Sequence, residues 1–210
     1  SEFQRDYDRL IFSAPFRRLQ NKTQVFPLPG SVFVHNRLTH SLEVSCVGRS
    51  LGNDVANQLL KKHPDLVDSH ISEIGSIVSA ACLAHDLGNP PFGHSGEKAI
   101  STYFSEGQGM ALKKELSPME WDDLTHFEGN ANAFRILTHQ FEGRRKGGFV
   151  MTYSTLASIV KYPFSSQLAG KKSKFGFFLS EEADYQKIAG ELGIIRLSKP
   201  DEPLRYARHP

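Results

Sequence analysis

Apolar residues recur at helical spacing along most of the chain. Between residues 41 and 62, Val47, Leu51, Val55 and Leu59 follow one another every four positions. Residues four apart share one face of an α-helix, so this pattern predicts an amphipathic helix. Thr39 stands just before it and is the expected N-cap.

The same periodicity predicts five further helices. Their apolar positions are Ile71, Ile74, Val78, Ala81 and Cys82; Ala99, Ile100, Tyr103 and Phe104; Phe127, Ala131, Phe134, Leu137 and Phe141; Leu156, Ile159 and Val160; and Tyr185, Ile188 and Leu192. Gly88 is expected to end the first of these, and Ser180 to cap the last. Two β-prone runs within 24–34 predict a small hairpin, and KFGFFL (174–179) predicts a second short strand. The predicted fold class is therefore all-α, with one or two small β-hairpins.

Composition sets limits on what this helical chain does. It has 210 residues, 39% hydrophobic and 23% charged, which is enough apolar mass for one globular domain. A formal net charge of +2 is too small to indicate nucleic-acid binding. No apolar run approaches the roughly 20 residues that a membrane span needs, and the polar start of the chain is unlike a signal peptide. Cys46 and Cys82 lie in apolar helical patterns, so we expect buried, reduced thiols in a cytoplasmic protein.

Histidine is the residue type that indicates chemistry, with nine in the chain. His85 and Asp86 are adjacent near the end of one predicted helix, and His40 lies at the start of the preceding helix. Antiparallel packing of these two helices brings the three side chains together. Mixed imidazole and carboxylate ligands favour a divalent ion such as Mn, Fe, Co, Ni or Zn over Ca. The sequence therefore predicts a metal site.

A second pair of chemically active residues follows nine positions later. His94 and Glu97 are three apart at the start of a predicted helix, so they face the same side. A carboxylate in that place orients an imidazole for acid–base work, although Glu97 also suits a simple interaction with the helix dipole. The segment 143–148, GRRKGG, is interpreted as a solvated basic loop, with a phosphate or nucleic-acid contact as the alternative.

These strings resemble a known family. HNRLTHSLEVSCVGRSLG and AHDLGNPPFGHSGE carry the H…HD signature of the HD metal-dependent phosphohydrolase superfamily. RDYDRLIFSAPFRRLQNKTQVFPL, HFEGNANAFRIL, KYP at 161–163 and KFGFF at 174–178 are similar to one branch, the deoxynucleoside triphosphate triphosphohydrolases (dGTPases). The strings occur in order over nearly the whole chain. The resemblance implies an HD-domain helical bundle.

The resemblance also implies roles for individual residues. His40, His85 and Asp86 match metal ligands of the family, for which manganese or magnesium is usual. His94 and Glu97 match the pair that assists attack at the α-phosphorus.

Substrate contacts follow from the same comparison of motifs. Gln24 stands where the family reads the sugar 3′-hydroxyl, and Val25 where the base and sugar pack. The residues expected to hold the triphosphate are Arg37, Asn130, Lys161, Tyr162 and Lys174. Their cationic, amide and phenol donors are the groups that phosphate oxygens need.

A fourth metal ligand of the family is expected outside these residues. In the family it is an aspartate on a helix that follows an RHP-like segment, and here that segment is residues 208–210. Asp184 and Asp201 stand in a different motif context. Since the family's polypeptides are about twice this length, we expect residues 1–210 to be the N-terminal portion of a single HD-domain enzyme, with the fourth ligand beyond Pro210.

The expected activity is metal-dependent hydrolysis of a deoxynucleoside triphosphate, dGTP above all, to deoxynucleoside and tripolyphosphate. One alternative keeps the site but changes the substrate to a nucleoside monophosphate, a cyclic nucleotide or guanosine tetraphosphate. Another is a non-catalytic module that binds nucleotides or single-stranded nucleic acid. The family resemblance further implies a homo-oligomer, often a hexamer, with single-stranded DNA as an effector and no membrane partner.

Overall fold

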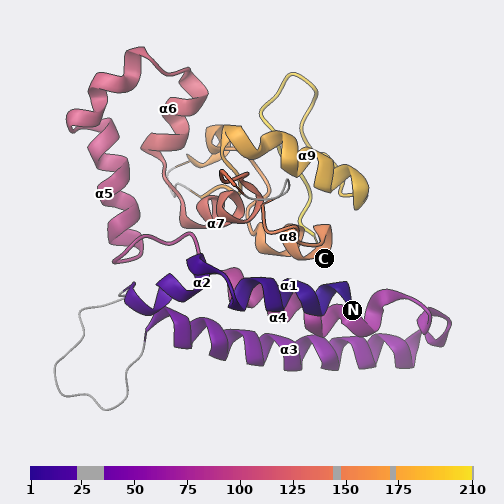
Figure 1. Ribbon diagram of the computed structural model, residues 1–210. Coiled ribbons are helices and arrows are strands. Elements are labelled where there is room, and N and C mark those ends of the chain that lie inside the picture. The colour runs from indigo at the N-terminus through magenta and orange to yellow at the C-terminus, as the bar shows by residue number, and fades with distance from the viewer. Residues whose placement is uncertain (23–35, 144–147, 171–173, 210) are drawn as a thin grey trace, which may run out of the picture.

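The computed structural model describes residues 1–22, 36–143, 148–170 and 174–209, and in these ranges the chain is predominantly helical (Figure 1). The α-helices are α1 (Glu2–Ile11), α2 (Ala14–Arg18), α3 (Arg37–Lys62), α4 (Ile74–Ala84), α5 (His94–Ser105), α6 (Pro118–Thr125), α7 (Gly129–Thr138), α8 (Tyr153–Ile159) and α9 (Glu182–Glu191). Short 3₁₀ turns are η1 (Leu19–Asn21), η2 (Pro64–Leu66), η3 (His70–Glu73), η4 (Gln108–Lys114), η5 (Ser166–Leu168) and η7 (Leu179–Glu181). The all-α prediction is confirmed.

Helix α4 is the centre of the molecule. It contacts α3, α1 and α8, and in the view of Figure 1 α3 lies below it and α8 above it. The main hydrophobic core includes Leu10 of α1, Leu83 of α4, Phe134 of α7, Leu156 of α8 and Tyr185 of α9. One continuous core therefore joins the layer of α1, α3 and α4 to the helices α7, α8 and α9.

Helix α3 packs on α4 through small residues. Its buried positions include Ser41, Ser45, Gly48, Gly52 and Ala56. A Cβ atom at Gly52 would lie 2.8 Å from the Cα atom of Gly75 in α4, so only glycine permits this approach. The apolar stripe from which the sequence predicts this helix lies on its solvent-exposed face instead. Val47 is 59% exposed, Leu51 60% and Val55 51%.

Three of the predicted helix ends are wrong. Helix α4 ends at Ala84 with His85 as its C-cap, and not at Gly88. Helix α3 begins at Arg37 and is capped by Asn36, whose side chain accepts from the Thr39 amide at 2.9 Å. Thr39 is the third helical residue, and its hydroxyl completes a capping box by accepting from the Asn36 amide. Ser180 lies in η7, because a 3₁₀ turn precedes α9 and moves its N-cap to Glu181.

Extended structure is sparse in the part of the chain that the structure describes. It consists of isolated bridges that join Phe164 to Arg205, Ser165 to Phe177 and Arg196 to Tyr206. The KFGFFL segment thus forms one bridge rather than a strand. Its Phe177 is fully buried in the main core, and its Phe175 is fully buried in a smaller cluster with Ala131, Ala169 and Phe178. The hairpin predicted within 24–34 lies outside the described residues.

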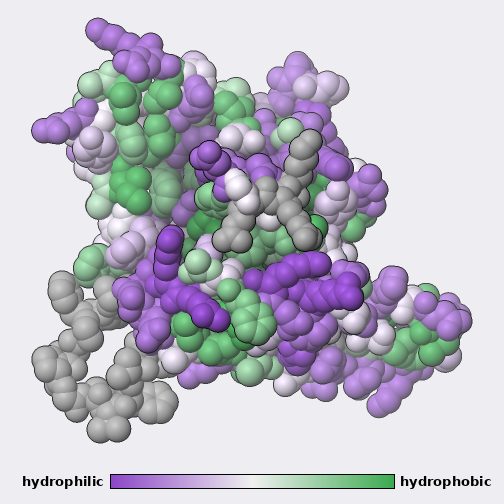
Figure 2. Space-filling view, viewed as in Figure 1, coloured by the Kyte–Doolittle hydropathy of each residue, from purple (hydrophilic) through white to green (hydrophobic). Residues whose placement is uncertain are grey.

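Helices α5 and α6 form an arm beside this body (Figure 1). Figure 2 shows apolar side chains on the arm, where Tyr103, Met110 and Leu112 are 51%, 50% and 43% exposed. The base of the arm is the start of α5, where His94 and Glu97 lie. None of the described helices is both long and apolar enough to span a membrane.

Candidate metal centre

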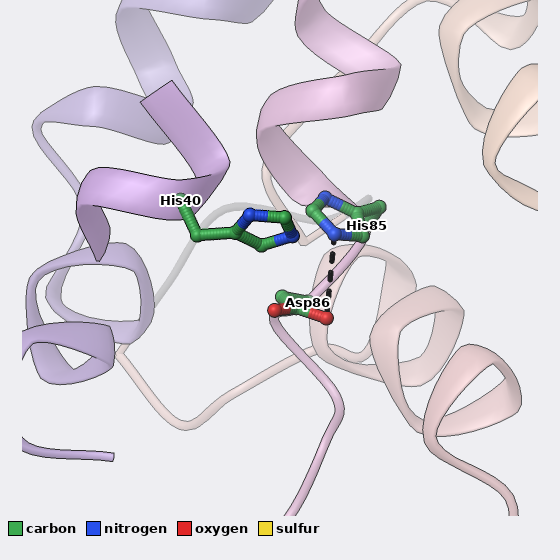
Figure 3. Close-up of side chains that lie close together, drawn as sticks. All are labelled: His40, His85 and Asp86. Atoms are coloured by element: carbon green, nitrogen blue, oxygen red, sulfur yellow. Dashed lines mark ion pairs between the residues drawn. The ribbon is translucent and has the colours of Figure 1, made fainter. Parts of the chain in front are cut away.

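Three side chains converge where α3 begins and α4 ends. His40 lies in the first turn of α3, His85 is the C-cap of α4, and Asp86 follows it. One ligand atom from each lies within 4.8 Å of the other two, and Figure 3 shows the two imidazole rings and the carboxylate around one point. Within the described residues this is the one group of three or more His, Cys, Asp or Glu side chains that could hold a metal ion. Neither Asp184 nor Asp201 belongs to it.

The His85 ring is oriented by the backbone. Its Nδ1–H donates to the carbonyl of Cys82 at 2.7 Å, which leaves the Nε2 lone pair for a ligand. Nε2 lies 3.4 Å from Oδ1 of Asp86 (Figure 3). A backbone acceptor on the far nitrogen is the usual support of a metal-binding histidine, so the donor set fits a divalent ion.

Asp86 is buried and held on both carboxylate oxygens. Arg37 donates to Oδ2 at 2.9 Å, and the Asn89 side-chain amide donates to Oδ1 at 2.6 Å. The side chains of Arg37 and Asp86 are only 5% and 7% exposed, so each charge depends on the other. Arg37, which the sequence indicates as a triphosphate ligand, thus contacts a metal ligand in this structure.

The turn after Asp86 is fixed against two other segments. The Lys22 ammonium donates to the carbonyls of Leu87 and Asn89 at 3.0 and 3.1 Å. Burial, and then the charge of Arg37, lowers the pKa of Lys22. On the other side, a Cβ atom at Gly88 would lie 2.0 Å from the carbonyl oxygen of Gly129, so the turn touches the backbone of α7.

His94 and Glu97 form the predicted pair at the start of α5. Phe92 and Gly93 both have positive φ, 67° and 56°, and turn the chain sharply into the helix. The His94 Nδ1–H donates to Oε2 of Glu97 at 2.7 Å, and the His94 side chain is 85% exposed. Oε1 of buried Glu97 accepts the Gly129 amide at 2.8 Å. Both this pair and the turn after Asp86 therefore rest on the start of α7.

Lys174 and Asn130 both bind Glu128, a residue that the sequence does not single out. Glu128 is fully buried and caps α7 by accepting the amides of Asn130 and Ala131. The Asn130 side-chain amide donates to Oε1 of Glu128 at 2.8 Å, and the Lys174 ammonium donates to the same atom at 2.7 Å. A carboxylate at the N-terminus of a helix interacts favourably with the helix dipole, and this is the signal in the sequence that could have indicated Glu128.

The remaining predicted site residues are only partly placed. Lys161 is exposed, with its ammonium 5.4 Å from the centre of the Tyr162 ring. Gln24 and Val25 lie outside the described residues, as does the basic stretch 144–146 of the GRRKGG segment.

Two histidines and an aspartate that surround one point in a helical domain form the arrangement of an H…HD metal site. The model of the HD domain family matches residues 37–162, and the chain belongs to that family.

Three relatives show more narrowly which proteins this chain is similar to. The chain is 49% identical over 218 residues to a deoxyguanosinetriphosphate triphosphohydrolase-like protein of Pseudomonas aeruginosa (strain LESB58), a match that covers 100% of this chain and 47% of the relative. A protein of the same description from Synechocystis is 44% identical over 221 residues, which are 100% of this chain and 50% of that protein. The deoxyguanosinetriphosphate triphosphohydrolase of Yersinia enterocolitica is 35% identical over 240 residues, 97% of this chain and 46% of its own length. The chain thus spans about half the length of these relatives.

Proposed function

We propose that this chain carries the metal site and the catalytic pair of an enzyme that hydrolyses a deoxynucleoside triphosphate, dGTP above all, to deoxynucleoside and tripolyphosphate. The observation that carries the proposal is the convergence of His40, His85 and Asp86 within 4.8 Å. The names of the relatives supply the substrate class.

His40, His85 and Asp86 would hold one divalent ion, for which manganese or magnesium is our choice. Such an ion supplies a Lewis acid for a phosphate oxygen and lowers the pKa of a water. We place a fourth ligand in the part of the relatives' length that this chain does not span.

Side chains of this chain would transfer the proton and neutralise the negative charge of the tripolyphosphate. His94 has Nδ1 fixed by Glu97, so its exposed ring offers Nε2 for proton transfer to or from the reacting oxygens. Lys161 and Tyr162 present an exposed ammonium and a phenol, which suit the oxygens of the departing tripolyphosphate. Gln24 and Val25 are kept as contacts of the sugar and base. The homo-oligomer and the single-stranded DNA effector rest on the family resemblance alone, and the cytoplasmic location rests on the expectation that Cys46 and Cys82 are reduced thiols.

Phosphorus NMR of dGTP with manganese tests this proposal. The incubation is run with this chain and with a version extended to the relatives' full length, and tripolyphosphate is the expected product. We expect His40→Ala and His85→Ala to abolish its release, because each removes a metal ligand. His63→Ala is the matched control, since His63 is exposed at the other end of α3, about 35 Å from His40 along the axis.

Three results would overturn parts of the proposal. Orthophosphate or pyrophosphate as the product would indicate a different nucleotide phosphohydrolase. Full activity of His85→Ala would remove the metal assignment. No product with any of the four dNTPs, from either length of protein, would favour a binding module.

A further inference from the structure

A single segment, residues 87–93, joins the predicted metal ligands to the predicted catalytic pair. Asp86 comes directly before it, and His94, directly after it, begins helix α5 (Figure 1). The backbone path of these residues therefore decides where the His94 ring lies relative to the metal centre.

Neighbouring elements fix most of this path. The carbonyls of Leu87 and Asn89 accept from the Lys22 ammonium at 3.0 and 3.1 Å. A Cβ atom at Gly96 would lie 2.2 Å from the carbonyl oxygen of Pro91, so the segment also lies against the first turn of α5. The proline ring itself fixes the φ angle of Pro91. The segment is thus anchored on both sides before it enters α5.

Phe92 has a strained backbone. The Gly93 amide donates to the carbonyl of Pro90 at 3.1 Å, which closes a four-residue turn with Phe92 in its third position. The φ angle of Phe92 is 67°, and a turn with positive φ at this position ordinarily has glycine or asparagine there. Since Phe92 is 46% exposed, burial of its ring offsets the cost of this conformation only in part.

Gly93 is unrestricted instead of strained. Its φ of 56° and ψ of −126° form a combination that essentially only glycine adopts. A Cβ atom there would also lie 3.0 Å from Nη2 of Arg37, the side chain that binds Asp86. Glycine is therefore required at 93. A second glycine at 92 would relieve the strain, but it would place two unrestricted residues directly before His94.

We propose that Phe92 is a positioning residue: its side chain restricts the backbone of the left-handed turn, and this restriction holds His94 in a fixed place relative to the metal ligands. The strain at Phe92 is the cost of that rigidity, because glycine in its place would allow α5 to start in more than one direction. The inference rests on the proposed function for its effect on catalysis, but its effect on the mobility of His94 is independent of any activity.

Phe92→Gly and Phe92→Ala separate the backbone from the ring. Both variants lose the ring, but only Phe92→Ala keeps a Cβ atom and with it the restricted backbone. Because glycine tolerates a positive φ, we expect Phe92→Gly to melt about 2–4 °C above Phe92→Ala. In the preparation that releases tripolyphosphate, we expect the opposite order for kcat. Phe92→Gly should lie about tenfold or more below Phe92→Ala, with KM within about twofold.

The order of the two Phe92 variants decides the question. A residue needed only for stability would give the same order in melting temperature and in kcat. Equal kcat of the two variants, or a lower kcat in Phe92→Ala, would overturn the inference, because the ring rather than the backbone would then be what matters.

Val150→Gly is the matched control. Val150 is the other non-glycine residue with positive φ in the described part of the chain, at 54°, and it is 48% exposed. It lies before α8 and outside the predicted site. We therefore expect its replacement to leave kcat within about twofold of the unmodified protein.

Backbone ¹⁵N order parameters measure the restriction without any turnover. We expect residues 93–95 to have values of about 0.85 in the unmodified chain and in Phe92→Ala, and below about 0.6 in Phe92→Gly. Val150→Gly should leave them unchanged. Rigid values in Phe92→Gly would overturn the inference, whereas absence of tripolyphosphate from the unmodified protein would overturn only the proposed function.

Discussion

Hydrogen bonds fix the orientation of the Asp86 carboxylate, one of the predicted metal ligands. Its two oxygens are occupied by Arg37 and Asn89, and the turn that follows it is held by Lys22. Such supporting hydrogen bonds fix the direction of the oxygen lone pairs and commonly contribute 10- to 100-fold, roughly, to metal affinity. The burial of Arg37 with Asp86 also means that neither charge can be removed alone without a large loss of stability.

Asn89→Ala tests this support. The substitution removes the amide that donates to Oδ1 of Asp86, the oxygen nearest His85 Nε2. We expect manganese affinity, measured by calorimetry, to fall about 10- to 100-fold. Asn132→Ala is the control, because Asn132 donates to the Gly88 carbonyl of the same turn but not to a ligand. Equal losses in both variants would contradict a specific role for Asn89.

Helix α3 shows that an apolar stripe does not by itself tell which face of an element is buried. Its close contact with α4 is made by Gly52 against Gly75, and the larger Val47, Leu51 and Val55 lie outside. Small residues allow two helix backbones to approach closely, and this approach sets His40 beside the end of α4. The packing of one helix pair therefore produces the ligand cluster.

Gly52→Ala and Val55→Ala compare the two faces of α3. The new methyl group at Gly52 would meet the Gly75 backbone at 2.8 Å, so we expect a loss of about 1–3 kcal/mol in the free energy of unfolding. Val55 is 51% exposed, and its truncation should change stability by no more than about 0.5 kcal/mol. Urea denaturation measures both. The opposite order would mean that the Val55 face is the one that packs.

At the scale of the whole molecule, three buried or half-buried acids lie where α6 meets η7, the 3₁₀ turn that leads into α9. Burial raises the pKa of Asp123, Glu181 and Glu182 above the ordinary values of 3.8 and 4.5. A carboxyl whose pKa is raised by folding binds its proton more tightly in the folded state. The stability that these groups contribute is therefore fully present below the unfolded-state pKa and is lost as the pH rises through the folded-state pKa.

Asp123→Asn should remove part of this pH dependence. Oδ2 of Asp123 accepts the Leu179 amide at 2.8 Å, and an asparagine oxygen can take that place without a charge. We expect the variant to match the unmodified chain at pH 3 and to be the more stable of the two at pH 7, because it has no charge to bury there. Thermal or urea unfolding between pH 3 and 8 measures the difference, with Asp54→Asn on the exposed face of α3 as the control. Equal stability of Asp123→Asn and the unmodified chain at pH 7 would contradict the prediction.

The sequence by itself determined the helices with a clear period. The predicted helices at α3, α5, α7 and α8 are present, because a 3.6-residue period is a local property of the chain. For α6, which the apolar period does not indicate, the signal in the sequence is the pair Ser117 and Glu120, which form a capping box around its first turn. The motif strings were sufficient to indicate the HD family, which the match over residues 37–162 bears out.

Only the tertiary structure decided which partners the side chains take. The contact of α3 with α4 sets His40 beside His85 and Asp86, and the buried Glu128 takes the donors of Asn130 and Lys174. The sequence contains each of these residues but not the distances between them. A buried charge must be compensated by whatever the fold brings near, so the positions of such charges depend on packing between elements far apart in the chain.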